Sequence, residues 1–424
     1  MYHYLTLIFP SCWELRFSVQ FCYSRSLITE IYHLYTSVAI NKKYYFLTLL
    51  KTIFNSMNST PIIYALEPFY GGSHKQFLVG LKSELHFEVR ILSMSPHHWK
   101  WRMHRSAGYF ADMINRENLE PGIILASDFV NLTALKGLVR EPERWTWIYY
   151  FHENQLTYPF REQKERDLTY AHINILSAIA ADRVYFNSEF HRQDFINAIP
   201  KFYSRFIDYT PKDYPARIGE KSSVLPLGLY LEKFDKVTSE KSNDNPGIIL
   251  WNQRWEHDKN PALFFETLFA LAEQDIPYQL IVCGERFSDY PDIFDEARAR
   301  LEDRIIHWGY AEEWEEYARL LWQADIVVST ADHEFFGISI LEAMYCQCYP
   351  LLPNRLVYPE YIPDPSKKRN LYRGRKQLAR KLADALSDMK VTREVHFRNV
   401  AEHFDWVNMK NKWNQEISSW LKST

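Results

Sequence analysis

Two glutamates, Glu334 and Glu342, frame a Phe-Gly turn in the sequence EFFGISILE, with seven residues between them. A glycosidase needs two carboxyl groups about 5 to 9.5 Å apart, whereas eight residues of helix rise about 12 Å. The pair is therefore badly placed to hydrolyse a glycosidic bond, and we expect the two acids to serve different groups of one long ligand. A nucleotide sugar, with hydroxyls at both ends, would suit them. Two ordinary helix acids are the alternative.

The elements that would position this turn are two strands and a helix. Short apolar runs at 325–329 and 349–352 are typical of central strands in a parallel sheet. Between them, apolar residues recur at helical spacing from Ile338 to Tyr345, so we predict a helix that begins near Gly337. Its amino end would face the carboxyl edge of the sheet, where open α/β sheets bind ligands. The N–H groups that can bind an anion there are those of Phe336, Gly337, Ile338 and Ser339.

Two cationic residues earlier in the chain also lie between a predicted strand and a predicted helix. Arg254 and Lys259 follow the apolar run at 248–251, and a helix begun by Asn260-Pro261 comes next. They therefore lie just after a predicted strand and just before a helix. A pair of solvated surface cations is the alternative interpretation.

In the first half of the chain, the ends of two predicted strands carry the residues of interest. Gly71-Gly72 follows the strand at 62–66, which allows close approach of a ligand to the backbone or simply a tight turn. His152 and Glu153 follow the strand at 147–151. A position at the carboxyl end of a strand favours function over core packing.

A basic and aromatic stretch, SPHHWKWRMHRSAGYF, spans 95–110 without an acidic residue. Cations alternate there with aromatic rings, which suits stacking on bases while neutralising phosphate. The alternative is an aromatic helix face packed on the domain. The candidate contacts with RNA are His98, Trp99, Lys100, Trp101, Arg102 and Arg105. A second segment, 365–381, holds eight cations and no acid; such a run is usually a solvated face, although it is dense enough to touch RNA phosphate.

The composition fits two ordinary domains in a chain of 424 residues. The net charge of −3 and the calculated pI of about 6.6 exclude a global field that draws the protein to nucleic acid, so any polyanion site must be local. Five cysteines, an odd number without paired zinc spacing, fit a reduced intracellular protein, and we expect a cytoplasmic location. We expect all five to be small buried hydrophobic residues.

The first 56 residues differ from the rest. They contain no apolar run of membrane-spanning length and no clear signal peptide. We interpret 1–56 as an extension of uncertain status and Met57 as a possible true start, with weak membrane association as the alternative. The other boundaries that we expect are a first domain at 57–238, a Ser/Asn/Asp-rich linker at 239–246, a second domain at 247–403 and a tail helix at 404–424.

The turn EFFGISILE resembles the Glu-x7-Glu signature of retaining glycosyltransferases of the GT-B fold, especially family four. With EPFYGGSHKQ, HHWKWR, YFHENQLTYP, RWEHDKNP and HWGY, the chain resembles the tRNA-queuosine α-mannosyltransferase family. The resemblance implies an α/β fold in which two Rossmann-like domains face a central cleft and a carboxyl-terminal helix crosses back to the first domain. It also implies transfer of mannose from GDP-mannose to queuosine in the anticodon of tRNA-Asp, with no metal or other cofactor.

The same resemblance implies roles for single residues. Arg254, Lys259 and the helix-start amides would stabilise the departing diphosphate. Glu334 and His152 would contact the sugar, and Glu342 the ribose. The other donor contacts would come from Gly71, Gly72, Gly284 and Tyr310.

The resemblance is incomplete at one point, and other functions stay open. Residues 225–234 resemble the last strand of the family's first domain, but Pro226-Leu227-Gly228 matches the usual Pro-Asn-Gly-like turn only in part. A transferase with another nucleotide sugar and a lipid or polysaccharide acceptor is one alternative. A sugar-nucleotide epimerase and a non-catalytic tRNA-binding protein are the others. We expect no stable membrane span and predict no protein partner.

Overall fold

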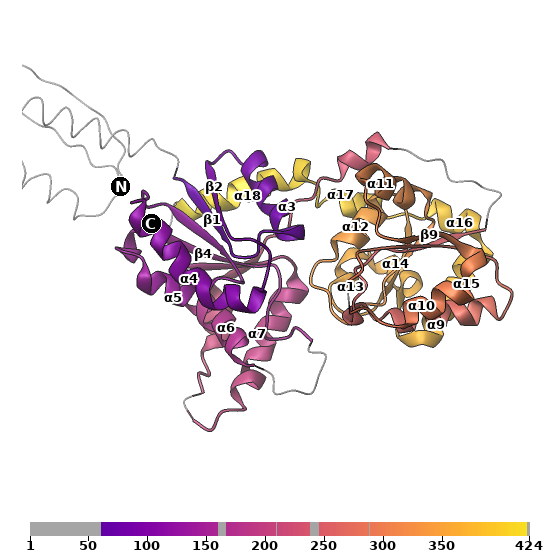
Figure 1. The fold of residues 1–424 in the computed structure, drawn as a ribbon, viewed down its shortest axis with the longest axis horizontal. Helices are drawn as coiled ribbons and strands as arrows, with labels where there is room; N and C mark the ends of the chain where they lie inside the picture. The colour runs from indigo at the N-terminus through magenta and orange to yellow at the C-terminus, as the bar shows by residue number, and fades with distance from the viewer. Residues whose placement is uncertain (1–60, 160–166, 209, 238–245, 288, 422–424) are drawn as a thin grey trace, which may run out of the picture. The chain divides into compact units, whose positions relative to one another are not determined.

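In the part of the chain that the structure describes, two parallel sheets of six strands each form the framework (Figure 1). The computed structural model describes residues 61–159, 167–208, 210–237, 246–287 and 289–421. The extension at 1–56, the possible start at Met57 and nearly all of the expected linker lie outside these described residues, as do Cys12 and Cys22.

The first sheet has the strand order β2-β1-β3-β4-β5-β6, with every pair parallel. Its strands are β1 (Ile63–Glu67), β2 (Val89–Ser93), β3 (Ile123–Ser127), β4 (Thr146–Phe151), β5 (Arg183–Phe186) and β6 (Ser222–Val224). Its helices are α3 (Gly72–Glu84), α4 (Trp99–Arg116), α5 (Leu132–Leu138), α6 (Thr169–Ala180), α7 (Glu189–Tyr203) and α8 (Tyr214–Glu220), with the 3-10 turn η1 (Pro142–Arg144).

Successive residues of the central strands pack into two different cores. Ile63 and Ala65 join the core on one face of the sheet, whereas Tyr64 and Leu66 join the core on the other. Because side chains alternate along a strand, a sheet covered by helices on both faces needs apolar residues at every position. This is why β1 is fully buried and reads as an unbroken apolar run until Glu67.

The second sheet has the order β12-β11-β10-β7-β8-β9, again with parallel pairs. Its strands are β7 (Ile248–Trp251), β8 (Gln279–Cys283), β9 (Ile305–Gly309), β10 (Ile326–Val328), β11 (Tyr349–Pro353) and β12 (Leu371–Tyr372). Its helices are α9 (Pro261–Ala272), α10 (Ile293–Arg300), α11 (Trp314–Gln323), α12 (Ile338–Tyr345), α13 (Tyr358–Tyr361), α14 (Asp364–Asn370), α15 (Gly374–Ser387) and α16 (Met389–Glu394). The 3-10 turns are η2 (Glu232–Lys236), which precedes this sheet, η3 (His257–Lys259) and η4 (Glu302–Arg304).

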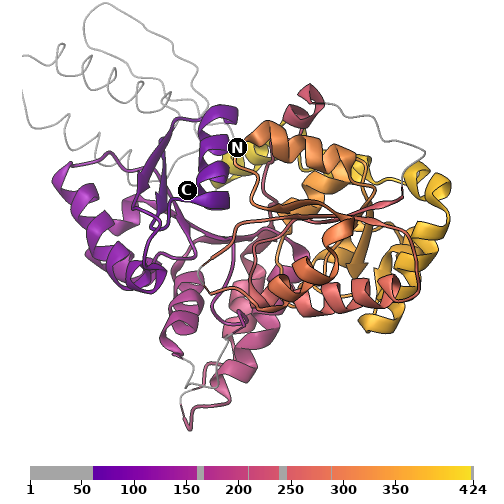
Figure 2. The same ribbon diagram turned by 45° about the vertical axis from the view of Figure 1, so that its right-hand side comes forward.

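The chain ends with α17 (Arg398–Glu402) and α18 (Trp406–Leu421), and α18 packs on the first half of the chain. Trp413 donates its Nε1–H to the carbonyl of Pro226 at 3.0 Å, and Trp420 donates to the hydroxyl of Tyr185 at 2.6 Å. Both views place the yellow α18 beside the indigo elements (Figures 1 and 2). Gly80 and Gly228 make room for Trp406, since a Cβ atom at either position would lie 2.3 Å from its ring. The expected return of the carboxyl-terminal helix is confirmed.

One predicted strand is wrong. Strand β6 ends at Val224, and the N–H of Leu225 makes a last bond to the carbonyl of Phe186 at 2.9 Å. Residues 226–234 then leave the sheet and run irregularly to η2. Pro226 has no N–H to donate to a ladder. Leu229 instead pairs with the segment before α18: its N–H donates to Phe404 at 2.7 Å, and its carbonyl accepts from Trp406 at 2.8 Å. The last strand of the first sheet is therefore three residues long.

Candidate functional site

The turn before α12 is built around Gly337, as the sequence predicts. Gly337 caps the helix with φ of 73° and ψ of 54°, a left-handed conformation that residues with a Cβ atom adopt at a cost. The carboxylate of Glu334 accepts the N–H of Gly337 at 3.1 Å and that of Phe336 at 3.5 Å. Two of the four amides expected to bind an anion therefore donate to Glu334. Those of Ile338 and Ser339, in the first turn of the helix, have no acceptor within the helix.

Lys259 lies directly against Glu334. Its Nζ is 3.3 Å from Glu334 Oε2 and 3.2 Å from Asp258 Oδ2, and it donates to the carbonyl of His333 at 3.1 Å. Burial lowers the pKa of Lys259, but the two carboxylates outweigh it and raise that pKa. Burial raises the pKa of Glu334, but Lys259 and His333 outweigh it and lower that pKa. The result is a buried ion pair at the start of α12.

Arg254 stands in contrast to Lys259, because half of its side chain is exposed. A guanidinium nitrogen lies 3.2 Å from Glu256 Oε2, and the side chain is 52% exposed. Burial lowers the pKa of Arg254, but Glu256 and Tyr158 outweigh it and raise that pKa. Arg254 therefore presents a permanent charge with several N–H donors.

Glu342 lies in the second turn of α12. Its Oε2 accepts the hydroxyl of Tyr317 at 2.7 Å, and Asn252 donates to Tyr317 at 3.3 Å and to the carbonyl of Ser339 at 2.8 Å. Burial raises the pKa of Glu342, and Lys233 and Tyr317 oppose that rise. Such a carboxyl can accept from or donate to a ligand hydroxyl. Its role towards a ribose stays a prediction.

His152 directly follows β4 of the first sheet and packs against three aromatic rings. Its ring centroid lies 4.2 Å from that of His74, 4.9 Å from that of Phe77 and 4.9 Å from that of Tyr150. Burial lowers the pKa of His152 well below its usual value, and the charges of His74 and His191 lower it further. His152 is therefore an uncharged imidazole at neutral pH.

The residues around His152 were missed by sequence reasoning. Glu67 ends β1, and Asp128 follows β3, so both lie at the carboxyl edge that also carries His152. The backbone N–H of His152 donates to Asp128 Oδ1 at 2.9 Å, and His74 Nδ1 lies 2.9 Å from Glu67 Oε2. The sequence feature that could have pointed to Glu67 and Asp128 is their position as the acidic residue at the end of an apolar run.

The glycines have structural explanations that hold whether or not a ligand binds. A Cβ atom on Gly71 would lie 2.7 Å from Pro96, and Gly72 has a left-handed φ of 50°. A Cβ atom on Gly284 would lie 1.8 Å from the carbonyl oxygen of Gln253. Their contacts with a donor stay predictions. So does that of Tyr310, whose side chain is exposed.

The basic stretch at 95–110 divides into inward and outward side chains. Trp99 packs on Tyr170 with 5.3 Å between ring centroids, and Arg102 donates to the hydroxyl of Ser95 at 2.8 Å, so packing explains these two. Trp101 is 56% exposed, with the guanidinium of Arg105 5.5 Å from its ring centroid. The exposed members of the predicted set are His98, Lys100, Trp101 and Arg105.

Segments from both halves of the chain meet at the loop before α12. The hydroxyl of Ser188 donates to the carbonyl of Phe335 at 2.7 Å, and the ring of His191 stacks on Phe335 at 3.8 Å. Tyr158 packs on His333 with 4.5 Å between ring centroids. Residues that follow β4 and β5 thus contact the loop that carries Glu334.

One group of side chains in the described residues has the composition of a metal site. Glu67, His74 and His152 bring one possible ligand atom each to within 4.8 Å of one another. However, the imidazole rings of His74 and His152 pack against each other, with 4.2 Å between their centroids and a tilt of 38°, whereas two ligands of one ion direct their ring nitrogens at it. Glu67 also uses its second oxygen to accept the N–H of Phe69 at 2.8 Å. The arrangement is that of a hydrogen-bonded cluster.

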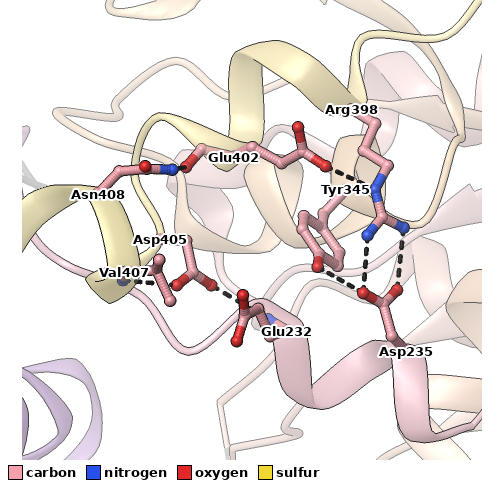
Figure 3. A pocket seen from close by; sticks show the side chains of 8 residues that line it. All are labelled: Glu232, Asp235, Tyr345, Arg398, Glu402, Asp405, Val407 and Asn408. Atoms are coloured by element: carbon pink, nitrogen blue, oxygen red, sulfur yellow. Dashed lines mark hydrogen bonds and ion pairs between the residues drawn. The ribbon is translucent and has the colours of Figure 1, made fainter.

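A pocket of about 420 Å³ lies elsewhere, at the far end of α12 (Figure 3). Arg398 donates to both oxygens of Asp235, at 2.9 and 2.7 Å, and to Glu402 at 2.8 Å, and Tyr345 donates to Asp235 at 2.8 Å. Its polar groups thus satisfy one another, and none of the predicted site residues lines it. The eight lining residues are Glu232, Asp235, Tyr345, Arg398, Glu402, Asp405, Val407 and Asn408.

Among the described residues, no helix is both long enough and apolar enough to cross a bilayer. Cys283, Cys346 and Cys348 are buried, as expected for small hydrophobic residues.

The fold and the site are those of a glycosyltransferase of the GT-B class. They combine two parallel sheets, a carboxyl-terminal helix that returns to the first half of the chain, and Glu334 in the turn before a helix. Solved structures share this fold. Anabaena HepE in complex with UDP and glucose matches with a TM-score of 0.60 and 16% identity, over 86% of this chain and 100% of that one. Sucrose-phosphate synthase from Thermosynechococcus elongatus matches with a TM-score of 0.63 and 15% identity, over 86% and 100%.

The sequence comparisons identify the family. The model for the amino-terminal domain of tRNA-queuosine alpha-mannosyltransferase matches residues 62–229, and the model for glycosyl transferases group 1 matches 232–402. The tRNA-queuosine alpha-mannosyltransferase of Drosophila melanogaster is 40% identical over 330 residues, which cover 76% of this chain and 86% of the relative. The chain therefore belongs to the tRNA-queuosine alpha-mannosyltransferase family. A GDP-mannose-dependent phosphatidylinositol dimannoside mannosyltransferase of Mycobacterium tuberculosis is 24% identical over 307 residues, 66% of this chain and 70% of that one.

Proposed function

We propose that this protein transfers mannose from GDP-mannose to queuosine in the anticodon of tRNA-Asp, with retention of configuration. The observation that carries the proposal is the buried Lys259–Glu334 pair at the start of α12, beside the exposed Arg254, in a chain of this family. The mannosyltransferase of Mycobacterium tuberculosis described above is named as GDP-mannose-dependent, which supports that donor.

The donor's diphosphate is the group that needs stabilisation. Negative charge grows on its oxygens as the bond to the sugar breaks, and donors that are already in place stabilise such charge best. Arg254, Lys259 and the first amides of α12 supply these donors. Lys259 is held charged and in position by Asp258 and Glu334, so little rearrangement is needed when the phosphate approaches.

The sugar would lie between Glu334 and His152. Glu334 stays ionised, because Lys259 lowers its pKa against the effect of burial, and a carboxylate accepts hydrogen bonds from sugar hydroxyls. His152, uncharged, donates with one ring nitrogen and accepts with the other. The departing phosphate takes the proton of the acceptor hydroxyl on the same face of the sugar, so the proposed mechanism needs no separate protein base.

The exposed face of α4 is the proposed contact with tRNA. Trp101 offers a ring for stacking on a base, and Lys100 and Arg105 offer charge to phosphates on either side of it. Trp99 and Arg102, both half-buried, would support this face through their contacts with Tyr170 and Ser95 rather than touch RNA.

The test offers GDP-mannose, UDP-glucose or GDP-fucose together with queuosine-containing or queuosine-free tRNA, followed by mass spectrometry of the nucleosides. The proposal requires one added hexose on queuosine with GDP-mannose and none on queuosine-free tRNA. Transfer from another donor, or to a lipid or polysaccharide, supports a different transferase. Isomerised donor without tRNA supports an epimerase, and bound tRNA without transfer from any donor supports a binding protein.

A further inference from the structure

We propose that Glu67 and His74 form a positioning pair for His152: the ion pair sets the charge and the orientation of the imidazole that meets the sugar. This inference deepens the proposed function, because it rests on the contact between His152 and the transferred sugar. Glu67 and His74 lie outside the residues that sequence reasoning assigned to the site. Neither touches the sugar in this proposal, so each acts through His152.

The carboxylate of Glu67 is fixed at both oxygens. Oε1 accepts the backbone N–H of Phe69 at 2.8 Å, and Oε2 lies 2.9 Å from Nδ1 of His74. Glu67 is fully buried, and a buried carboxylate is stable only with a partner of opposite charge or several hydrogen bonds. His74 supplies that charge. Burial alone would lower the pKa of His74, but the charge and hydrogen bond of Glu67 raise it to about 9.

The ring of His74 is held between two other rings. Phe129 stacks on it with 5.4 Å between centroids and a tilt of 15°, and His152 lies against it at 4.2 Å and 38°. The orientation of His152 therefore depends on that of His74, which depends in turn on its hydrogen bond to Glu67. The backbone of His152 is anchored separately, by Asp128 Oδ1 at its N–H and by the Asn187 amide at its carbonyl, with distances of 2.9 and 2.8 Å.

The charge of His74 acts on His152 through this contact. A positive group so close to a second imidazole disfavours a second positive charge, which adds to the effect of burial. The other titratable groups that influence this cluster are Asp128, Glu153 and His191. Burial raises the pKa of Asp128 well above its usual value and also raises that of Glu153, whereas the pKa of His152 is set by burial, His74 and His191 rather than by these two carboxyl groups.

An uncharged His152 suits the proposed reaction for a physical reason. The sugar becomes cationic as its bond to the diphosphate breaks, and an imidazolium in contact with it would oppose that charge. A neutral imidazole can still donate to or accept from a sugar hydroxyl. The Glu67–His74 pair thus places one positive charge behind His152, where it prevents a second one next to the sugar.

The test compares the full-length protein with the variants His74→Gln, Glu67→Gln and the double variant Glu67→Gln/His74→Gln. The double variant keeps a neutral hydrogen bond between two amides, so it stays informative if a single variant folds poorly. His396→Gln, an exposed histidine outside the site, is the matched control. Two quantities are measured for each: kcat/KM for mannosyl transfer as a function of pH, and the charge states of the labelled histidines by NMR titration without substrate.

The expected result is that His74 is an imidazolium at neutral pH and titrates near pH 9, while His152 stays uncharged. In the variants without the ion pair, His152 should titrate about 1 to 2 pH units higher, and the acid limb of the kcat/KM profile should move up with it. A loss of activity by the same factor at every pH would show a packing role only and overturn the proposal. So would a neutral His74 at pH 7, or stoichiometric metal in the purified protein.

The NMR titration separates this inference from the proposed function. If the charge states are as expected but no mannose reaches queuosine, the proposed function fails while the charge-setting pair stands. If mannose is transferred but His152 titrates identically in the wild type and in the variants, the pair fails while the proposed function stands.

Discussion

At the residue scale, the two cations of the donor site differ in how much of the fold depends on them. Lys259 lies buried between Glu334 and Asp258, whereas half of the Arg254 side chain is exposed beside Glu256. Removing a buried partner leaves charges without compensation, but removing an exposed one does not. The effects of the two residues on catalysis and on stability should therefore separate.

We expect Arg254→Ala to lower kcat by about 10²- to 10³-fold, the usual effect of losing one pre-placed donor to developing charge, and to change the free energy of unfolding by less than about 1 kcal/mol. Lys259→Ala should lower kcat as well and also destabilise the protein by about 3 kcal/mol, because two carboxylates lose their partner. Steady-state kinetics and urea unfolding of both variants check this. An Arg254→Ala protein with the kcat of the wild type would reject the role of Arg254.

His74 gives a second prediction at this scale, a loss of stability in mildly alkaline solution. Its pKa is about 9 in the folded protein and about 6.5 in an unfolded chain, so the folded state binds the proton more tightly. The stabilisation is complete below pH 6.5 and is lost as the pH rises through 9, and its size is on the order of 3 kcal/mol. Unfolding free energies measured across this window should fall in the wild type and stay nearly level in Glu67→Gln. An equal fall in both would contradict the assignment, and His396→Gln should behave like the wild type.

The sequence indicates which residues stand at strand ends but not which of them meet. Lys259 and Glu334 were predicted as site residues separately. They are 75 positions apart in the sequence, and no local sequence pattern indicates a contact between residues so far apart. Glu67 was missed because a single polar residue after an apolar run is explained by a strand end alone, and His74 because it stands among polar residues at the start of a helix. Only the order of the strands in the sheet places Glu67, Asp128 and His152 at one edge.

At the scale of elements, the start of α12 depends on one backbone conformation. Gly337 has φ of 73°, and a Cβ atom there would lie 3.4 Å from Cγ of Glu334. Gly337→Ala should therefore cost about 1 to 2 kcal/mol of stability, the penalty of a left-handed alanine, and should raise the KM for the donor because the turn and Glu334 shift. Gly337→Asn, which tolerates this conformation better, should lose less stability. Chemical unfolding and donor kinetics measure both effects; an alanine variant as stable as the wild type would contradict the strain argument.

The spacing of apolar residues predicts most of the helices and strands, but it fails where a segment pairs with residues far along the chain. Helix α12 and strands β7 and β11 begin where the pattern places them, because apolar spacing is a local property. The strand expected at 225–234 is wrong because Leu229 forms its bridge with Asp405, a residue far along the chain, and donates its N–H to Phe404. Gly228 was interpreted as part of a turn, whereas the structure uses it to admit the ring of Trp406.

At the scale of the whole molecule, the charge distribution decides how tRNA can be held. The net charge of −3 gives no general attraction to nucleic acid, so affinity must come from local clusters of cations. Exposed clusters in the described part of the chain include the face of α4 with Lys100 and Arg105, and α15 with Lys376 and Arg380. The exposed ring of Trp101 distinguishes the first, since its ring can stack on a base.

Salt dependence of tRNA binding tests which cluster contacts RNA. Each phosphate contact adds about 0.7 to 0.9 to the slope of log K against log salt. We expect Lys100→Ala/Arg105→Ala to reduce that slope by about 1.5, and the matched control Lys376→Ala/Arg380→Ala to leave it unchanged. Trp101→Ala should weaken binding by about 1 to 3 kcal/mol without changing the slope, because stacking releases no counterions. The KM for the donor should be the same in all three, since none of these residues belongs to the donor site. A reduced slope in the α15 variant with an unchanged slope in the α4 variant would place the RNA on the other cluster and refute the proposed acceptor surface.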